Sequence, residues 1–308
     1  MLSGTVLVQG LTFITSRSQI LYSQKNLKFE FKSSPLPFSD MNGNDTITIS
    51  NVKASASIQS SGNLFGTQAT VTIFGLGLEL ISALSSKAMG LFSSDGDRVS
   101  MKIFVGDVAV FAGFMTSSIA NMNQVPDAAL MITATANAEL QNKTASPFSF
   151  KGSTSIRSVI ESICASAGYS PLINGLNGVM VNNPHYEGSM FQQLEQICYA
   201  LKISMSVTPP KISFWETNTK RDNEIPLVSA QNGLIGYPIF SNGGVMFQTQ
   251  FSTLLTTGRN VALKTLLPHA DGEYNLSSVT HELSSWMPGG PWHSICIANR
   301  EQKEVPNG

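Results

Sequence analysis

The sequence predicts a mainly β protein of the α+β class, in which a small α/β region separates two longer β regions. Apolar and polar residues alternate with a period of two in residues 27–138 and again beyond residue 226, which is typical of half-buried strands. Apolar residues at a helical period are concentrated in residues 155–202. The expected organisation is an N-terminal domain (1–149), a small α/β insert domain (150–224) and a C-terminal domain (225–308).

The chain has 308 residues, which is enough for two or three domains, and it is poor in charge. Charged residues make up 13% of it and the net charge is −1, whereas about 25% charged residues is typical. This composition lacks the basic surface of a nucleic-acid binder, and its 42% hydrophobic content excludes a disordered chain. Charge on the surface keeps proteins apart in solution. The low charge of this chain therefore favours a protein whose surfaces bind other proteins.

The N-terminal domain is expected to contain six or more strands and one short helix. Residues 27–32 alternate apolar and charged side chains, and Pro35 and Pro37 end this strand. The helix is indicated by apolar residues three and four apart in residues 76–84. Further strands are expected at residues 46–58, 69–74, 99–105, 108–114 and 128–138. This composition of elements is typical of a barrel or a sandwich.

The insert is expected to hold two helices and a hairpin. Residues 155–167 carry one apolar stripe that Gly168 is well placed to end. Residues 189–202 carry a second stripe, and Ser189 with Gln192 reads as a capping box. Residues 203–207 and 211–215 then predict a hairpin. These elements form a small α/β unit.

The C-terminal domain follows a polar linker, residues 218–224. Candidate strands lie at residues 228–235, 245–251, 260–266, 272–283 and 292–299. Asn242-Gly243-Gly244 predicts a turn between the first two strands. The sequence shows no short-period repeat, and it leaves open that the two β domains are distant copies of each other.

No complete catalytic motif occurs in the sequence. His281-Glu282 begins like a zinc-protease motif, but residue 285 is Ser, so the second ligand is missing. Gly75 and Gly77 begin like a dinucleotide-binding loop that lacks its third glycine. A pair of hydrolytic carboxylates is defined only in space, so the 20 acidic residues leave that alternative open. The expectation is a protein that is not an enzyme.

The three cysteines, Cys164, Cys198 and Cys296, are expected to be buried free thiols, because their spacing fits neither a zinc site nor a disulfide scaffold. We expect no cofactor and no bound metal. No apolar run approaches the roughly 20 residues of a membrane span. Met1 to Phe13 lacks the features of a signal peptide, so we expect no membrane anchor.

Trp286 and Trp292 flank a loop rich in Gly and Pro. Exposed tryptophans on a rigid loop favour contact with a partner, either a protein or a carbohydrate. The alternative is that both side chains cover the end of a β domain. The sequence leaves these interpretations open.

Segments in several parts of the chain resemble one known family, and their order carries the resemblance. These segments are residues 69–76, 105–107, 110–113, 183–189, 233–240, 244–249, 251–255, 258–263, 272–274 and 279–283, followed by Trp292. In this order they resemble the baseplate hub proteins of contractile-tailed bacteriophages. That family includes late-control-protein-D-like hubs and is related to the hub domains of type VI secretion spikes. The motif positions are Phe111, Gly113, Pro184, Tyr186, Gly188, Gly236, Tyr237, Pro238 and Gly244.

The resemblance implies a fold and a set of partners. Each subunit would carry two β-barrel domains similar to the tail-tube protein, separated by the small α/β domain. A homotrimer would place six such barrels in a ring that joins the six-fold tail tube to the three-fold central spike. The ring would line the channel through which DNA passes as cargo. Tape measure and baseplate wedge proteins are further expected partners.

The resemblance also implies a location in the virion, at the tail baseplate, after assembly in the host cytoplasm. It transfers no catalytic residue. Two alternatives stay open: a tail-tip peptidoglycan hydrolase, which needs an unrecognised carboxylate pair, and a glycan-binding tail protein, which would use the loop between Trp286 and Trp292.

Overall fold

The computed structural model describes residues 25–38, 43–61, 66–89, 98–123, 128–143, 145–217, 219–241 and 243–300, and it is mainly β as predicted. The first part of the chain contains β1 (Leu27–Ser34), β2 (Thr46–Ile49), β3 (Ala54–Ser61), β4 (Thr67–Phe74), α1 (Leu78–Met89), β5 (Arg98–Val105), β6 (Val108–Asn121) and β7 (Ala129–Thr135). The middle segment contains α2 (Ala138–Asn142), β8 (Phe148–Ser149), β9 (Ser153–Ser155), α3 (Ile156–Ser166), β10 (Ser170–Ile173), β11 (Met180–Asn182), β12 (His185–Tyr186), α4 (Met190–Leu201), β13 (Ile203–Thr208) and β14 (Lys211–Glu216). The last part contains β15 (Leu227–Val228), the 3₁₀-helix η1 (Ala230–Asn232), β16 (Leu234–Ser241), β17 (Gly244–Gln250), β18 (Asn260–Leu263), β19 (Gly272–Ser285) and β20 (Trp292–Arg300).

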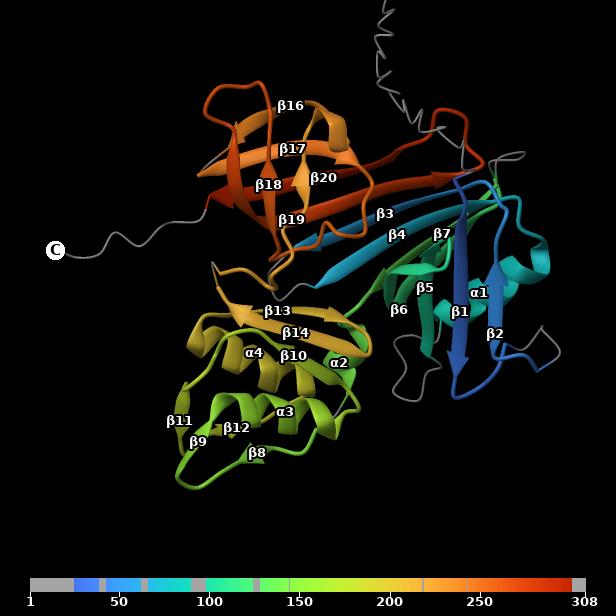
Figure 1. The fold of residues 1–308 in the computed structure, drawn as a ribbon. Coiled ribbons are helices and arrows are strands. Elements are labelled where there is room, and N and C mark those ends of the chain that lie inside the picture. Colours follow the sequence, from blue (N-terminus) through green and yellow to red (C-terminus); the bar gives the residue numbers. More distant parts are fainter. Residues whose placement is uncertain are drawn as a thin grey trace, which may run out of the picture.

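One 13-stranded sheet runs through both β regions (Figure 1). Its order is β16-β17-β20-β19-β3-β4-β7-β6-β5-β1-β2, and β18 and β15 attach beside β19. The two regions meet where Ser278–Ser285 of β19 pairs antiparallel with Ala54–Ser61 of β3. The two β regions are thus parts of one sheet, and no closed barrel is found in the described residues. The expectation of two separate barrels is not confirmed.

Two blocks of four strands in this sheet share one connectivity. Each block consists of two hairpins, β3–β4 with β6–β7 and β16–β17 with β19–β20, and in each the spatial order is first, second, fourth, third. The third strands, β6 and β19, are both 14 residues long. Each contains a bulge, between Met115 and Ser117 in β6 and between Leu276 and Ser278 in β19. The two blocks have the arrangement expected of distant copies.

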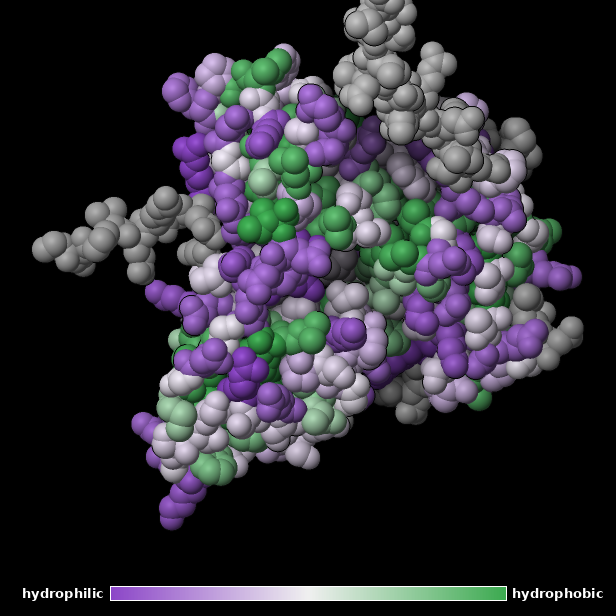
Figure 2. All heavy atoms as spheres, viewed as in Figure 1, coloured by the Kyte–Doolittle hydropathy of each residue, from purple (hydrophilic) through white to green (hydrophobic). Residues whose placement is uncertain are grey.

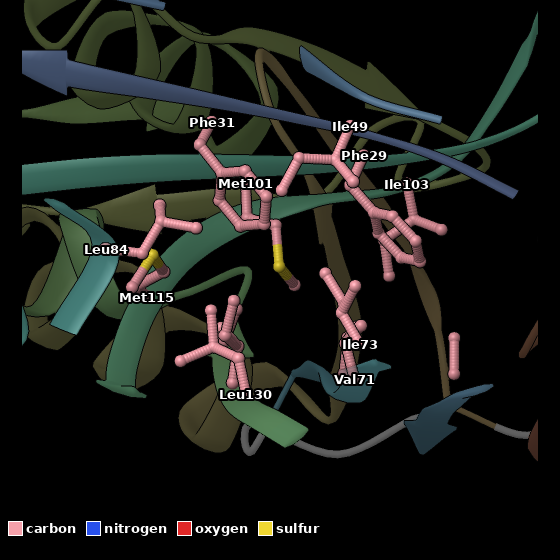
Figure 3. Packing of buried hydrophobic residues seen from close by; sticks show 14 of the residues in the cluster. Phe29, Phe31, Ile49, Val71, Ile73, Leu84, Met101, Ile103, Met115 and Leu130 are labelled. Carbon is pink, nitrogen blue, oxygen red and sulfur yellow. The ribbon is translucent and has the colours of Figure 1, made fainter. Parts of the chain in front are cut away.

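The largest cluster of buried side chains lies inside the curved sheet formed by β1 to β7 (Figure 3). The alternation in β1 places Phe29 and Phe31 on the inner face, where both are fully buried. Leu84 of α1 and Met101 of β5 complete this packing from other elements. Each large apolar side chain that is fully buried contributes about 1.5–3 kcal/mol to folding.

The middle segment lies beside the large sheet and has its own core (Figure 1). The helices α3 and α4 pack by their apolar stripes next to the three-stranded sheet β10-β14-β13. The predicted capping box is confirmed, because Ser189 accepts from the Gln192 backbone and the Gln192 side chain accepts from the Ser189 backbone. Leu140 of α2 packs in the same core.

Several predicted boundaries differ from the structure for local reasons. The expected strand at residues 46–58 is split into β2 and β3, because Asn51 adopts the left-handed conformation at φ 57°. The strand expected at 228–235 is replaced by β15, η1 and the start of β16. β6 continues to Asn121, beyond the predicted end at residue 114, because its second half pairs with β7. The alternation of apolar and polar residues within one segment does not predict how far pairing with a neighbouring strand will extend it.

Candidate interaction surface

The edge strand β16 exposes a row of large apolar side chains. The exposed fractions are 42% for Ile235, 65% for Tyr237, 59% for Ile239 and 55% for Phe240. Natural edge strands are usually protected by charged residues, but residues 225–258 contain no charged residue. Figure 2 shows apolar side chains interrupting the polar surface over these C-terminal strands. This edge has the chemistry of an interface with another protein.

A second free edge lies along the last part of β6. Ser100–Val105 of β5 pairs with β6 only from Val108 to Phe114. Beyond Phe114, β7 pairs with one side of β6 up to Asn121, and no strand among the described residues pairs with the other side. Ile119 in this stretch is 62% exposed. The last part of β6 is therefore a second stretch of the sheet that has a strand on one side only, within the described residues.

The outward side chains of the central strands are themselves uncharged, and the charged groups of Lys53 and Glu282 lie at the margins of this face. The sequences of β3, β4 and β7 contain no charged residue. Their outward side chains are hydroxyl and amide groups for the most part, namely Ser55, Ser57, Gln59, Gln68, Thr70, Thr72, Thr133 and Thr135. Glu282 of β19 stands beside this face and accepts a hydrogen bond from Ser57 at 2.7 Å. This face would bind neither phosphate groups nor cations strongly.

The middle segment is attached to the sheet through the linker that follows β14. Arg221 donates to Ser213 of β14 at 2.8 Å and to Thr256 beside the C-terminal strands at 3.1 Å. Its guanidinium group lies 5.6 Å from the centre of the Trp215 ring. Burial lowers the pKa of Arg221, and the attraction of Asp222 opposes this shift. The predicted polar linker is thus an ordered junction where the structure describes it.

His281 lies in β19, which confirms that the His281-Glu282 pair belongs to a strand rather than to a zinc-binding helix. Its Nδ1 is 2.8 Å from the Ser294 hydroxyl, and its ring meets Phe251 edge to face at 5.1 Å. Burial lowers the pKa of His281 to about 4, although a hydrogen bond with the Leu255 backbone opposes this shift. The imidazole is therefore neutral near pH 7. It borders a small cavity of about 70 Å³ where the three parts of the chain meet.

The three cysteines are free and buried, as predicted. Burial raises the pKa of each thiol, Cys164, Cys198 and Cys296, to about 12. Nucleophilic and metal-binding chemistry needs the thiolate, which these sites disfavour. Within the described ranges, no three His, Cys, Asp or Glu side chains come together as metal ligands.

The family-motif positions in the β regions divide between tight packing and exposed surface. Phe111 is buried, and a side chain at Gly113 would meet the Thr135 backbone at 2.9 Å. Gly244 is held against the backbone of Ala298 and Asn299 in β20. Gly236, Tyr237 and Pro238 form the irregular stretch of β16 between Ile235 and Ile239, with Tyr237 exposed and Pro238 buried.

The other motif positions lie in the middle segment and are far from β16 in sequence. Pro184 is buried and accepts a hydrogen bond from the Phe150 backbone at 3.1 Å. Tyr186 pairs with Phe148 in the small β12–β8 ladder, and Gly188 precedes α4 with φ +103°. These positions support the local fold of the loop before α4.

The two tryptophans have different surroundings. Trp286 is 51% exposed and stands just after β19 with φ 53°. Trp292 packs against the N-terminal core, and its ring contacts Phe251 edge to face at 5.8 Å. Lys25 lies 5.6 Å from the centre of the same ring. Trp286 is thus the more available of the two for a partner.

Sequence reasoning did not find the two strand edges that lack a neighbouring strand in the described part of the chain. A usable signal existed for β16, because a long uncharged stretch that contains a strand indicates an interface. No local signal marks the free half of β6. Every helix within the described residues falls short of the length and apolar character that a membrane crossing needs.

Residues 38–287 match the family described as Baseplate hub gp41. Comparison with curated proteins gave no match.

Similar solved structures are phage tail and secretion proteins at very low sequence identity. The 43 kDa tail protein of prophage MuSo2 from Shewanella oneidensis is 8% identical with a TM-score of 0.57, and the match covers 91% of this chain and 97% of that chain. A tail protein from Neisseria meningitidis MC58 is 8% identical with a TM-score of 0.58, covering 89% and 97%. The E. coli c3393 protein, described as a type VI secretion component similar to T4 tail proteins gp27 and gp5, is 10% identical with a TM-score of 0.55, covering 82% and 74%.

Proposed function

The chain belongs to the baseplate hub gp41 family, and we propose that it acts as a homotrimeric adaptor between a six-fold tail tube and a three-fold central spike. The family is one of structural phage tail proteins, so the proposed role is mechanical rather than enzymatic. In this role the protein sits at the tail baseplate of the virion, where tape measure and wedge proteins are its further neighbours.

The observation that carries this proposal is the pair of four-strand blocks with one connectivity in a single chain. Three copies of the chain present six such blocks, which is the number needed to continue a six-fold tube. We propose that each block takes the part of one tube-like barrel, in an N-terminal domain (1–149) and a C-terminal domain (225–308). The small domain between them (150–224) then lies outside the ring of blocks.

We infer that the uncharged outward side chains of β3, β4 and β7 face the DNA channel. Lysine and arginine side chains on a channel wall would bind phosphates and hold the DNA. The hydroxyl and amide side chains of this face, such as Thr70 and Thr133, have no such effect. The net charge of −1 for the whole chain supports this assignment.

The spike and the tube are proposed partners at the two ends of the ring. Exposed apolar side chains away from β16 offer positions for contact with these partners. Of the two tryptophans that the sequence suggests for partner contact, Trp286 is the better candidate, because half of its surface is exposed. Tryptophan side chains commonly dominate the energy of protein interfaces. The substitution Trp286→Ala is therefore expected to weaken attachment of one neighbour in the tail.

The copy number in purified tails tests the proposed function. Quantitative mass spectrometry with labelled peptides of this chain and of the tube protein should give three copies per tail, against six per ring for the tube protein. Crosslinks to both tube and spike should accompany that number. Six or more copies would contradict the adaptor role, and absence from the particle would favour the alternative of a separate hydrolase.

A further inference from the structure

We propose that Asn177 is a site of spontaneous deamidation, and that the fold selects it over an identical dipeptide nearby. The loop between β10 and β11 contains Asn174-Gly175 and, one residue later, Asn177-Gly178. In an Asn-Gly dipeptide the backbone nitrogen of the glycine can reach the side-chain amide carbon of the asparagine, because glycine has no Cβ to obstruct the approach. The proposal goes beyond the proposed function and does not depend on it, because the reaction needs only one folded chain.

The reaction exchanges the side-chain amide for a carboxylate in two steps. In the first step the Gly178 nitrogen loses its proton to hydroxide and forms a bond to Cγ of Asn177. The bond from Cγ to Nδ2 breaks, and ammonia leaves with a proton taken from water. In the second step water opens the cyclic imide, adding hydroxyl to one carbonyl carbon and hydrogen to the ring nitrogen. The product is aspartate or isoaspartate, according to which carbonyl is attacked, and either one adds a negative charge.

The contacts of the Asn177 side chain favour this reaction. Arg157 of α3 donates from Nη2 to Oδ1 of Asn177 at 3.5 Å. The same nitrogen donates to the carbonyls of Ile173 at 3.2 Å and Gly175 at 3.1 Å, so the cation is held beside the amide. As Gly178 attacks, negative charge develops on Oδ1, and a fixed positive group at that atom stabilises it. Arg157 therefore stabilises the transition state more than the resting amide.

The attacking group at this site is unobstructed. Within the described residues, the Gly178 N–H donates no hydrogen bond. The position that a Cβ of Gly178 would occupy has no atom within 4 Å. The residues on either side are anchored, because Leu176 is buried and the Val179 carbonyl accepts from the Ile156 backbone at 3.0 Å. Asn177 and Gly178 are themselves exposed, so water is available for the second step.

The neighbouring Asn174-Gly175 has the opposite surroundings. The amide nitrogen of Asn174 donates to the Lys220 carbonyl at 2.8 Å, so turning this side chain toward Gly175 breaks a hydrogen bond. The Glu216 carboxylate lies 3.8 Å from the position that a Cβ of Gly175 would occupy. Its negative charge opposes loss of the proton from the Gly175 nitrogen. The contacts of the folded chain thus favour Asn177 over Asn174.

Peptide mapping of the full chain after incubation at mildly alkaline pH tests the proposal. Mass spectrometry follows, over several weeks, the mass gain that results when NH2 is replaced by OH at each asparagine. Fragment ions distinguish the two sites, because Leu176 lies between them. We expect Asn177 to deamidate about fivefold faster than Asn174 in the folded protein, which corresponds to about 1 kcal/mol of activation free energy. Equal rates at the two sites, or a faster rate at Asn174, would overturn the proposal.

The same measurement in concentrated guanidinium chloride is the matched control. In the unfolded chain both asparagines still precede a glycine, but neither is held by the contacts of the fold, so the two rates should agree within about twofold. A preference for Asn177 that persists after unfolding would come from the sequence alone and would overturn the role of the fold. This comparison uses the unsubstituted chain, so it does not depend on the folding of a variant.

Substitution of Arg157 tests the contact with the amide oxygen. In Arg157→Gln the positive charge is removed, so the rate at Asn177 is expected to fall about fivefold. The rate at Asn232, which precedes Gly233 in another part of the chain, should stay the same, and circular dichroism checks the fold. A rate at Asn177 that is unchanged or higher in this variant would overturn the role of Arg157. None of these outcomes bears on the copy number in tails, which tests the proposed function separately.

Discussion

Arg259 holds the carboxylate of Asp222 with two of its nitrogens, Nε at 2.9 Å from Oδ1 and Nη2 at 2.6 Å from Oδ2. Its third nitrogen, Nη1, donates to the Leu254 carbonyl at 2.7 Å. Burial raises the pKa of Asp222, but the hydrogen bonds and charge of Arg259 outweigh it and the pKa is lowered. This pair ties the linker after β14 to the C-terminal strands and so sets how the middle segment sits on the sheet.

Removing the carboxylate charge should weaken the fold at this junction. In Asp222→Asn, the largely buried guanidinium of Arg259 loses its charged partner, so we expect a loss of about 1–3 kcal/mol in the free energy of unfolding. Urea denaturation measures this loss. The control Asp45→Asn removes the exposed ion pair with Lys32 and should leave stability unchanged. Equal effects in the two variants would contradict the structural role of the junction.

The stability of the protein should fall as the pH is lowered from about 6.5 to about 4. The folded-state pKa of His281 is about 4, whereas an unfolded histidine has a pKa near 6.5. Protons therefore bind the unfolded chain first, and up to about 3 kcal/mol of stability is lost over this interval. Urea titrations at pH 7.5, 5.5 and 4.5 should show the decline. His281→Gln should flatten it, whereas His185→Gln, at an exposed position, should not.

The position of Gly258 should not accept a side chain. A Cβ atom there would lie 2.5 Å from the Trp215 ring, and the residue has φ +82°. Gly258→Ala adds a clash to backbone strain, so we expect a loss of about 2–4 kcal/mol. Gly178 has φ +78° and open space around its Cβ position. Gly178→Ala should therefore cost only the strain of about 1 kcal/mol, and a similar loss in both variants would refute the packing argument.

A charge on the edge of β16 should prevent self-association without unfolding the protein. Phe240→Asp places a carboxylate among the exposed apolar side chains of this edge strand, so we expect association through this edge to weaken by about tenfold, or about 1.4 kcal/mol. Analytical ultracentrifugation measures it, and circular dichroism checks the fold. Leu266→Asp is the control, because Leu266 is 88% exposed and lies outside both strand edges. Unchanged association in Phe240→Asp would argue against the β16 interface.

Positive charge on the proposed channel wall should slow DNA release. Particles with Thr70→Lys and Thr133→Lys in this chain should assemble but eject DNA more slowly, most visibly at low salt, because lysines bind phosphates. Fluorescence of a DNA-binding dye after triggered ejection gives the rate. Ser170→Lys, on exposed β10 of the middle segment, serves as control. Equal rates in all particles would exclude this face from the channel.

Elements with a complete local signal were predicted well from the sequence. The alternation in residues 27–32 became β1, and the apolar stripe of residues 155–167 became α3. The helix α4 begins at its predicted capping box, because Ser189 and Gln192 interact within a single turn. Each of these features depends on residues close in the chain, so a window of the sequence contains the whole cause.

Features that depend on distant residues were not predictable in the same way. The outcome for Phe240 shows this, because its exposure depends on which strand lies beside β16 and not on its own neighbours in the chain. The junction formed by Arg221 and Arg259 likewise joins residues from the linker and from the segment just before β18. Nothing in the polar linker sequence distinguishes such a junction from a solvated loop.

The sequence by itself determined the class of the fold, the order of its β and α/β regions, the buried free thiols and the resemblance to baseplate hubs. Only the tertiary structure decided that the two β regions form one open sheet, through the pairing of Ser57 with Glu282 and their neighbours. The physical reason is that strand pairing uses backbone groups that every residue carries, so local alternation identifies a strand without identifying its partner. Which strands remain without a neighbour on one side, β16 and the end of β6 among the described residues, is likewise decided only by the arrangement of the strands in space.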